Sequence, residues 1–432
     1  MRDEAESSGV KSFVLRGANV LDEAGGFARP LDVHVADGRV VAVGENLSAG
    51  DASALDFSDL WLMPGVFDCH DHVTLSSIDA FECMSRPITE WVLEGARQAR
   101  QTLTVGVTSV RDCGGADPGI RDAIARGYVP GPNLFVSIVM LSQTGGHGDG
   151  FLAGPGFEMT NGYLMPSWPG KPPYLVDGVE SMRRAVRALL RSGVDFVKLA
   201  ATGGQVSEHD HPLEPQFTLE EIEAAVFEAS RKGRHVAAHA YGGEGLENAV
   251  RAGVRSIEHG GFLTEEQAVR MAEAGCWLVP TLSAMRDTLE WAETGRLTPA
   301  QCKKILDFGL ELGGAVRLAK EHGVRMAIGT DYIMREQHGN NLEELLLMRQ
   351  AGLTPEETLL AATTGGAELC GVEKEYGRIA PGYVFDAIVL DEDPGDLSCF
   401  ASPGAVTGVF KAGEAALPHE RVRDAGLVGA TG

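Results

Sequence analysis

The sequence predicts an α/β fold, a (β/α)8 barrel joined to a small β-sandwich domain that both chain ends build. Two observations lead to this prediction. Across the middle of the 432-residue chain, short apolar runs alternate with longer helical stretches. Near both ends, short β-type runs are instead separated by turns that contain glycine and proline. Strands that are apolar throughout are buried on both faces, as in a parallel sheet covered by helices.

In the middle of the chain one unit recurs, in which a helical stretch ends in glycine and a buried strand follows. Helices often end with glycine because it adopts the left-handed conformation at little steric cost. Two helical stretches begin with a capping box, Thr218 with Glu221 and Thr264 with Gln267. A doubly wound open sheet also explains the repeat, but not why polar residues at the strand ends should converge. The eight expected strands are residues 66–69, 107–110, 134–140, 196–199, 236–239, 256–259, 277–279 and 326–329.

The two chain ends have a different pattern from the middle. Residues 33–43 alternate around Asp37-Gly38, which is a strong signal for a β-hairpin. Similar β-type runs stand at residues 12–20 and 383–390. We expect these end segments to pair, with the barrel inserted between them. The predicted boundaries are 1–63 with 379–432 for the small β-domain and 64–378 for the barrel.

Composition and charge are typical of a globular enzyme and exclude some partners. The chain is 44% hydrophobic and 23% charged, with a net charge of -24. This charge argues against nucleic acid or an anionic membrane as partner, because both attract basic surfaces. The seven cysteines are scattered, as expected for reduced thiols rather than a disulfide framework. There is no signal-peptide pattern and no apolar run long enough to span a bilayer, so we expect a cytoplasmic protein.

Residues of the types that bind metals follow the apolar runs. His70 and His72 stand after the first run, and His239, His259 and Asp331 end three later ones. In a barrel the carboxyl ends of the strands meet at one face, where active sites lie. Residues i and i+2 of an extended segment point to the same side, so His70 and His72 can bind one ion together. Imidazole and carboxylate suit zinc, manganese, iron or nickel. The ordered set therefore predicts two divalent metals and hydrolytic chemistry.

Lys198 is the unusual member of this set, because it lies inside the apolar run Phe-Val-Lys-Leu-Ala-Ala. Burial disfavours the charged form of a lysine and leaves a nucleophilic amine. That amine can react with carbon dioxide to give a carbamate, an anion able to bridge two cations. The alternative is a lysine paired with a carboxylate inside the barrel. The metal-type residues that flank it along the chain favour the carbamate.

Three further residues are candidates for contact with a substrate. His147 lies in the glycine-rich stretch 144–149 after the third expected strand, and glycine lets the backbone approach a ligand. Tyr241 follows His239 by two positions, so its phenol should face the same way and could polarise a carbonyl. Arg286, after the seventh expected strand, could bind a substrate carboxylate. The alternative for each is a packing or surface role.

Together these motifs resemble the amidohydrolase superfamily in its binuclear, carboxylated-lysine type. The resemblance is strongest to Xaa-Pro and Xaa-Arg dipeptidases and their imidazolonepropionase-like relatives, although imidazolonepropionase itself lacks the bridging lysine. Three departures from the family pattern stand out: Asp71 in place of threonine, Tyr332-Ile333 in place of small residues, and 384–386 in place of a Lys-Leu-Ala-Asp-type turn. The motifs follow the family's order at residues 64–72, 197–198, 239–242, 257–260, 328–331, 361–363 and 377–382.

The resemblance implies a ligand set and a mechanism. His70, His72 and Asp331 would bind one metal and His239 and His259 the second, with carboxylated Lys198 and a hydroxide bridging them. Asp331 would accept the proton of the hydroxide and pass it to the leaving amine, while Tyr241 polarises the carbonyl. The implied cofactors are two divalent ions, zinc first with manganese or iron as alternatives, and carbon dioxide for Lys198.

We therefore expect a metal-dependent amidohydrolase that cleaves the amide C–N bond of a dipeptide or N-acyl amino acid. Its small-molecule substrate would carry a carboxylate, and a homo-oligomer is left open. One alternative is hydrolysis of a lactam, carbamate or phosphoester on the same site. The other is a di-iron enzyme that activates oxygen with the same ligands, because these ligands suit iron as well.

Overall fold

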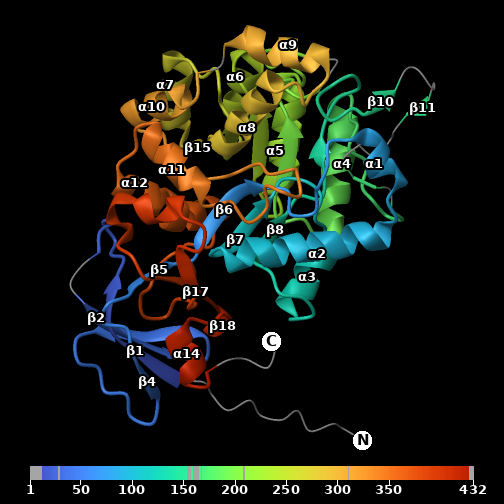
Figure 1. Cartoon of the computed structure of the whole chain (residues 1–432). Coiled ribbons are helices and arrows are strands. Elements are labelled where there is room, and N and C mark those ends of the chain that lie inside the picture. The colour runs from blue at the N-terminus through green and yellow to red at the C-terminus, as the bar shows by residue number, and fades with distance from the viewer. Residues whose placement is uncertain are drawn as a thin grey trace, which may run out of the picture.

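The computed structural model describes residues 12–27, 30–152, 157–158, 165–166, 168–207, 210–309 and 311–427 (Figure 1). Parallel strands that alternate with helices occupy the middle of the chain, and a separate sheet contains strands from both ends. The predicted α/β class is therefore confirmed. The barrel and the sandwich are finer statements, and they remain predictions.

Strands from both chain ends share one eight-stranded sheet with the order β18-β17-β16-β5-β1-β2-β3, in which β4 pairs with β1. Its strands are β1 (Ser12–Val20), β2 (Leu31–Ala36), β3 (Arg39–Gly44), β4 (Ser53–Asp56), β5 (Trp61–Pro64), β16 (Ala387–Leu390), β17 (Val406–Lys411) and β18 (Glu414–Leu417). The expected hairpin is confirmed: β2 and β3 are antiparallel, and Asp37 (φ 52°) and Gly38 (φ 74°) form the turn between them. The division into domains stays a prediction.

The middle of the chain holds two parallel sheets, one with the order β6-β7-β8 and one with the order β15-β14-β13-β12-β9. Their strands are β6 (Val66–Asp71), β7 (Val107–Asp112), β8 (Asn133–Val136), β9 (Met140–Leu141), β12 (Val197–Ala200), β13 (Val236–Ala240), β14 (Ser256–His259) and β15 (Trp277–Val279). A short antiparallel pair of strands, β10 (Phe151–Leu152) and β11 (Phe157–Glu158), forms a separate two-stranded sheet.

Helices follow most of these strands and cover the parallel sheets (Figure 1). The capping boxes expected at Thr218 and Thr264 are both present, where α5 and α7 begin. The helices are α1 (Ala80–Ser85), α2 (Ile88–Thr104), α3 (Pro118–Ala125), α4 (Val179–Ser192), α5 (Leu219–Ser230), α6 (Gly243–Ala252), α7 (Glu265–Ala274), α8 (Leu282–Glu293), α9 (Pro299–Phe308), α10 (Gly314–Glu321), α11 (Glu343–Gln350), α12 (Pro355–Leu360), α13 (Gly366–Cys370) and α14 (Glu420–Asp424). Among the described residues, none of these helices has the length and apolar character needed to cross a membrane.

The eighth expected strand is absent as a regular strand. Residues 326–329 make only an isolated bridge, between Met326 and Leu278 of β15. The segment nevertheless lies between the two parallel sheets, because the amide of Cys69 on β6 donates to the carbonyl of Ile328 at 2.8 Å. The third expected strand is also interrupted: β8 ends at Val136 and β9 begins at Met140, with Ile138 between them at φ 69°.

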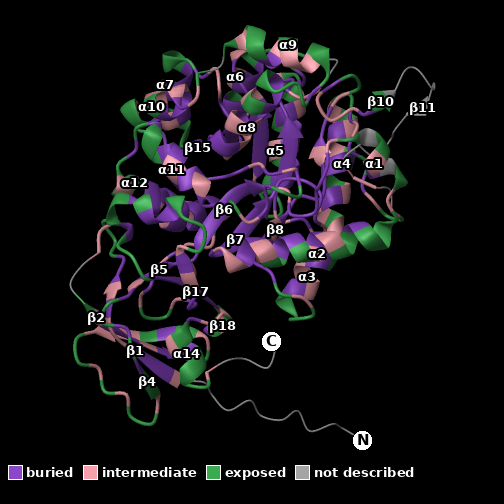
Figure 2. Cartoon of the chain, viewed as in Figure 1, coloured by how far each residue is buried: buried purple, intermediate pink, exposed green. Residues whose placement is uncertain are grey.

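Most of the parallel strands, namely β6, β7, β12, β13, β14 and β15, are buried along their whole length, as Figure 2 shows for the centre of the molecule. Burial includes charged side chains: Arg111 on β7, Lys198 on β12 and Glu258 on β14 are each at most 1% exposed. Buried charges are costly unless they are paired or bind a metal. The contacts of these three residues therefore show how each buried charge is compensated.

Candidate metal centre and active site

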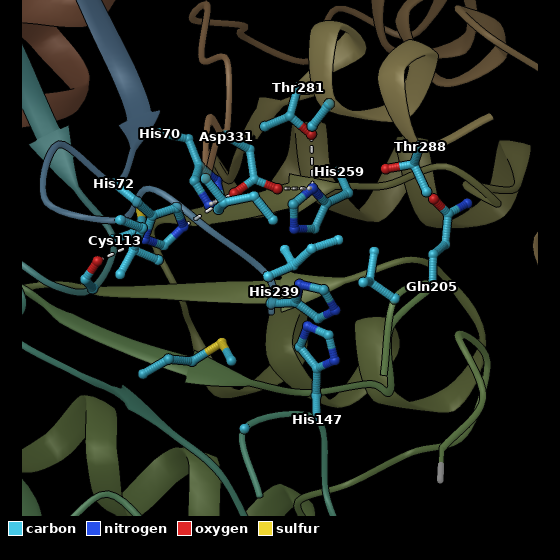
Figure 3. A pocket seen from close by; sticks show the side chains of 18 of the residues that line it. His70, His72, Cys113, His147, Gln205, His239, His259, Thr281, Thr288 and Asp331 are labelled. Carbon is cyan, nitrogen blue, oxygen red and sulfur yellow. Dashed lines mark hydrogen bonds and ion pairs between the residues drawn. The ribbon is translucent and has the colours of Figure 1, made fainter. Parts of the chain in front are cut away.

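One pocket opens where the central parallel strands end, and all but one of the predicted site residues line it (Figure 3). His70 comes from β6, Lys198 from β12, His239 from β13 and His259 from the last position of β14, while Asp331 follows the 326–329 segment. All six residues predicted to bind metal line this pocket: His70, His72, Lys198, His239, His259 and Asp331.

His70, His72 and Asp331 form the tightest group, and their ligand atoms lie within 4.8 Å of one another. The carboxylate oxygen Oδ1 of Asp331 is 3.3 Å from Nε2 of His70 and 3.0 Å from Nε2 of His72. Burial alone would raise the pKa of Asp331, but the two imidazoles hold it well below its ordinary value. An ionised carboxylate and two imidazoles are a ligand set that divalent zinc, manganese and iron accept.

In both histidines the ring nitrogen Nδ1 already makes a hydrogen bond, and this bond fixes the orientation of the ring and of its other nitrogen, Nε2. Nδ1 of His70 donates to the carboxylate of Glu258 at 2.8 Å, and Nδ1 of His72 donates to the carbonyl of Gly114 at 2.7 Å. Each Nε2 is thereby left to face Asp331. Metal-binding histidines in proteins are held in this way, with the second ring nitrogen donating to a carboxylate or carbonyl. The residues present therefore fit a divalent metal.

Lys198, His239 and His259 continue the pocket beyond this trio. Nζ of Lys198 is 3.5 Å from Nε2 of His70, and the ring centroids of His239 and His259 are 4.5 Å apart. Burial, together with neighbouring positive charge that includes Lys198, lowers the pKa of both His239 and His259 well below the ordinary value. Neutral imidazole is the form that binds a metal. These side chains could hold a second ion beside the first.

The neighbours of His239 and His259 also orient their rings. His239 Nε2 donates to the carbonyl of Gly203 at 3.1 Å, and His259 Nδ1 makes a 2.7 Å hydrogen bond with the hydroxyl of Thr281. His259, Thr281 and Asp331 all adopt positive φ, at 74°, 51° and 57°. Left-handed backbone at residues other than glycine costs about 1–3 kcal/mol and is concentrated at functional sites. Three such residues line this one pocket, which supports its assignment as a functional site.

A buried ion pair between Arg111 and Glu258 contacts the metal-type residues through His70. Arg111 Nη2 is 2.6 Å from Glu258 Oε1, and Glu258 Oε2 accepts from His70. Although burial alone would raise the pKa of Glu258, the Arg111 guanidinium and Lys198 hold it below its ordinary value. The sequence had not indicated Glu258 as a functional residue, although its place in a buried strand beside His259 was an available signal.

Two of the three residues predicted to contact a substrate, Tyr241 and His147, line the pocket. The ring of Tyr241 stacks on that of His259, with centroids 5.2 Å apart. His147 stacks on His239 at 4.2 Å, and its Nδ1 is held by Ser207 at 3.2 Å. Burial raises the pKa of Tyr241, so its phenol keeps the proton that it would donate to a substrate oxygen.

Arg286, the third candidate for contact with a substrate, lies outside this pocket, and its predicted role stays a prediction. It is not among the described residues that line the pocket. Its guanidinium instead pairs with Asp287 at 2.7 Å and with Glu343 of α11 at 2.7 Å. The ion pair with Glu343 joins α8 to α11.

Imidazole, carboxylate and lysine side chains that meet where parallel strands end are the donor set of hydrolases that use divalent metals. The chain belongs to the amidohydrolase family, whose profile matches residues 61–416. The predicted family and the predicted enzyme class, a hydrolase that acts on carbon–nitrogen bonds, are thereby confirmed.

Several relatives are similar over most of the chain. Ochratoxinase of Aspergillus niger is 36% identical over 365 residues, which cover 82% of this chain and 75% of that protein. A prolidase crystallised with N-methylphosphonate-L-proline has a TM-score of 0.86 and 33% identity, over 94% of this chain and 99% of that one. A Xaa-Pro dipeptidase with methionine bound in its active site has a TM-score of 0.84 and 28% identity, over 94% and 99%.

Proposed function

We propose that the protein is a metal-dependent amidohydrolase that cleaves the amide C–N bond of a dipeptide or an N-acyl amino acid. The observation that carries this proposal is that six metal-type side chains, far apart in the sequence, line one pocket. Family membership and the relatives named prolidase and Xaa-Pro dipeptidase support the choice of an amide bond.

The proposal includes an architecture. The two parallel sheets and residues 326–329 form a (β/α)8 barrel, residues 64–378, and the end sheet belongs to a small β-domain of residues 1–63 and 379–432. The hydrogen bond from Cys69 to Ile328 supports this closure. In such a barrel the ligands from different strands reach the same face.

His70, His72 and Asp331 would hold one divalent ion, and His239 and His259 the other. Lys198, as its carbamate, would lie across both, and its amine 3.5 Å from His70 Nε2 is placed for this role. When bound, two divalent ions lower the pKa of water and stabilise negative charge that develops on the substrate oxygen. Zinc as the metal, the carbamate, a cytoplasmic location and any homo-oligomer remain predictions.

The chain's own residues move the protons and orient the substrate. Asp331, ionised and 22% exposed at its side chain, accepts a proton from the attacking water and passes it to the leaving amine. Tyr241 donates its phenolic proton in a hydrogen bond to the carbonyl oxygen. His147 contacts the part of the substrate beyond the scissile bond.

The test combines metal content with hydrolysis. Protein purified without chelator or a nickel column would be analysed by mass spectrometry and assayed on a panel of dipeptides and N-acyl amino acids. About two divalent ions per chain, with amide cleavage lost in both Lys198→Ala and Asp331→Asn, would support the proposal. Full activity in both variants would overturn it, and so would two irons with oxygen consumption and no hydrolysis.

A further inference from the structure

One wall of the pocket is apolar and is assembled from four separate segments. Ile78, Val206 and Ile333 pack against a buried cluster that contains Trp291 of α8, and all four residues line the pocket. Trp291 is buried, but the other three are only partly covered by protein. We call these four residues the apolar wall. Apolar surface that faces a pocket favours a bulky apolar ligand group, because binding removes that surface from water.

Gln205 stands beside this wall with an unused hydrogen-bonding group. Its side chain is 3% exposed, and the residue lines the pocket. The amide nitrogen Nε2 is buried and has no hydrogen-bond partner. Figure 3 shows the side chain extending from its loop on the side of the pocket where Thr288 lies. A buried amide without a partner is costly, and each such group in a native structure requires an explanation.

Two other polar side chains of the pocket, those of Gln337 and His147, already have partners. The side-chain oxygen of Gln337 accepts from the amides of Ile333 and Met334, and its nitrogen donates to Asp287. Nδ1 of His147 is held by Ser207. Among the described residues that line the pocket there is no arginine. A carboxylate that enters this pocket therefore meets neutral donors beyond the metal-type residues, and among these Gln205 has a buried amide nitrogen without a partner.

We infer that Gln205 binds the substrate and determines specificity. Its amide donates to the substrate's carboxylate, while a bulky apolar side chain of the same substrate packs against the apolar wall. The inference rests on the proposed function and narrows its substrate class to N-acyl amino acids that carry a large apolar side chain. It also replaces Arg286 as the residue that recognises the carboxylate.

The experiment uses two variants and three probes. The full-length, metal-loaded enzyme and its variants Gln205→Leu and Gln205→Glu are assayed on N-acetyl-L-phenylalanine, N-acetylglycine and N-acetyl-L-phenylalaninamide. Release of the free amine is followed by chromatography. Gln350→Glu on α11, which is exposed and outside the pocket, is the matched control for the added charge. Metal content and thermal unfolding are measured for every variant.

We expect the wild-type enzyme to prefer N-acetyl-L-phenylalanine over N-acetylglycine. Gln205→Leu should lower kcat/KM for N-acetyl-L-phenylalanine about 10- to 100-fold, with unchanged metal content. Gln205→Glu should invert the preference between acid and amide probes, because a carboxylate repels the acid but accepts a hydrogen bond from the primary amide. If Gln205 had a purely structural role, the substitutions would lower kcat/KM for the acid probe and for the amide probe by the same factor.

An unchanged acid-to-amide ratio in Gln205→Glu would overturn the inference, as would unchanged kcat/KM in Gln205→Leu. A wild-type enzyme that cleaves dipeptides but none of the N-acetyl probes would also overturn it, and would leave the proposed function standing. A wild-type enzyme that cleaves no amide at all would overturn the proposed function instead.

Discussion

Replacing Glu258 by glutamine tests whether the buried ion pair beneath the pocket serves the metal site. The carboxylate of Glu258 accepts from Nδ1 of His70 at 2.8 Å and pairs with Arg111 at 2.6 Å. Glutamine keeps the size of the side chain and removes its charge. The variant should therefore bind metal more weakly, because His70 loses the charged partner that fixes its proton and ring.

The size of the effect follows from the two contacts. Loss of a hydrogen-bonded partner behind a ligating histidine weakens metal binding about 10- to 100-fold, or about 1.4–2.8 kcal/mol. Arg111 is buried and would lose its counter-charge, and breaking a buried pair costs about 3–5 kcal/mol of folding stability. Both losses should appear together, and Arg111→Met added to Glu258→Gln should restore much of the stability but not the metal affinity.

Zinc affinity would be measured by competition with a chelating indicator, and the free energy of unfolding of the metal-free protein by urea titration. Glu228→Gln is the matched control, because Glu228 on α5 pairs with Arg183 and Arg187 away from the pocket. Wild-type zinc affinity in Glu258→Gln would refute the reasoning. Equal losses of affinity in Glu228→Gln would show that the effect is not specific to the site.

Four further outcomes are expected. Wild-type enzyme dialysed free of carbon dioxide should lose activity and regain it with bicarbonate, whereas Lys198→Arg should show no such recovery; equal activity before and after dialysis would contradict the carbamate. Burial lowers the pKa of His235 to about 3, against an ordinary 6.5. The unfolded chain therefore binds a proton that the folded chain rejects as the pH falls below 6.5. His235→Phe should remove this loss of stability, worth about 2 kcal/mol at pH 5, and a urea titration at pH 5 and 7.5 checks it. Arg286→Ala should leave KM within about 2-fold of wild type, and a large rise in KM would return this residue to the substrate site. Ile333→Ala should lower the preference for N-acetyl-L-phenylalanine over N-acetylglycine about 10-fold, as measured by the ratio of kcat/KM.

The sequence predicts which metal-type residues line the pocket, because each of them is placed by a local rule. His239 ends an apolar strand and His259 ends the next, and parallel neighbours bring such ends together. The ion pair of Arg286 could not be predicted, because its partner Glu343 lies 57 positions later in the sequence, on a helix whose position depends on the whole fold. The segment 326–329 reads as a strand but makes only one bridge, because a buried apolar run does not specify its own pairing.

Gln205 was also beyond sequence reasoning, for a different physical reason. A glutamine in a polar loop is most often solvated, and the loop around it carries charged and small residues. Only the structure shows that this side chain is 3% exposed with an unpaired nitrogen. The chemistry of an amide is fixed by its type, but the cost of leaving it unpaired arises only once water is excluded.

The departures from the family pattern can now be separated by where they lie. Asp71 is buried, accepts from the amide of Asn341 at 3.3 Å, and does not line the pocket. Tyr332 is also buried, and its hydroxyl donates to the carbonyl of Asn340 at 3.2 Å, which anchors the loop behind Asp331. Ile333, the next residue, lines the pocket. The two residues of this unusual dipeptide therefore differ in role. Tyr332 holds the loop that carries Asp331, and Ile333 forms part of the pocket surface. Because these roles fall on different side chains, a change at Ile333 should alter substrate preference while the metal-type residues keep their positions.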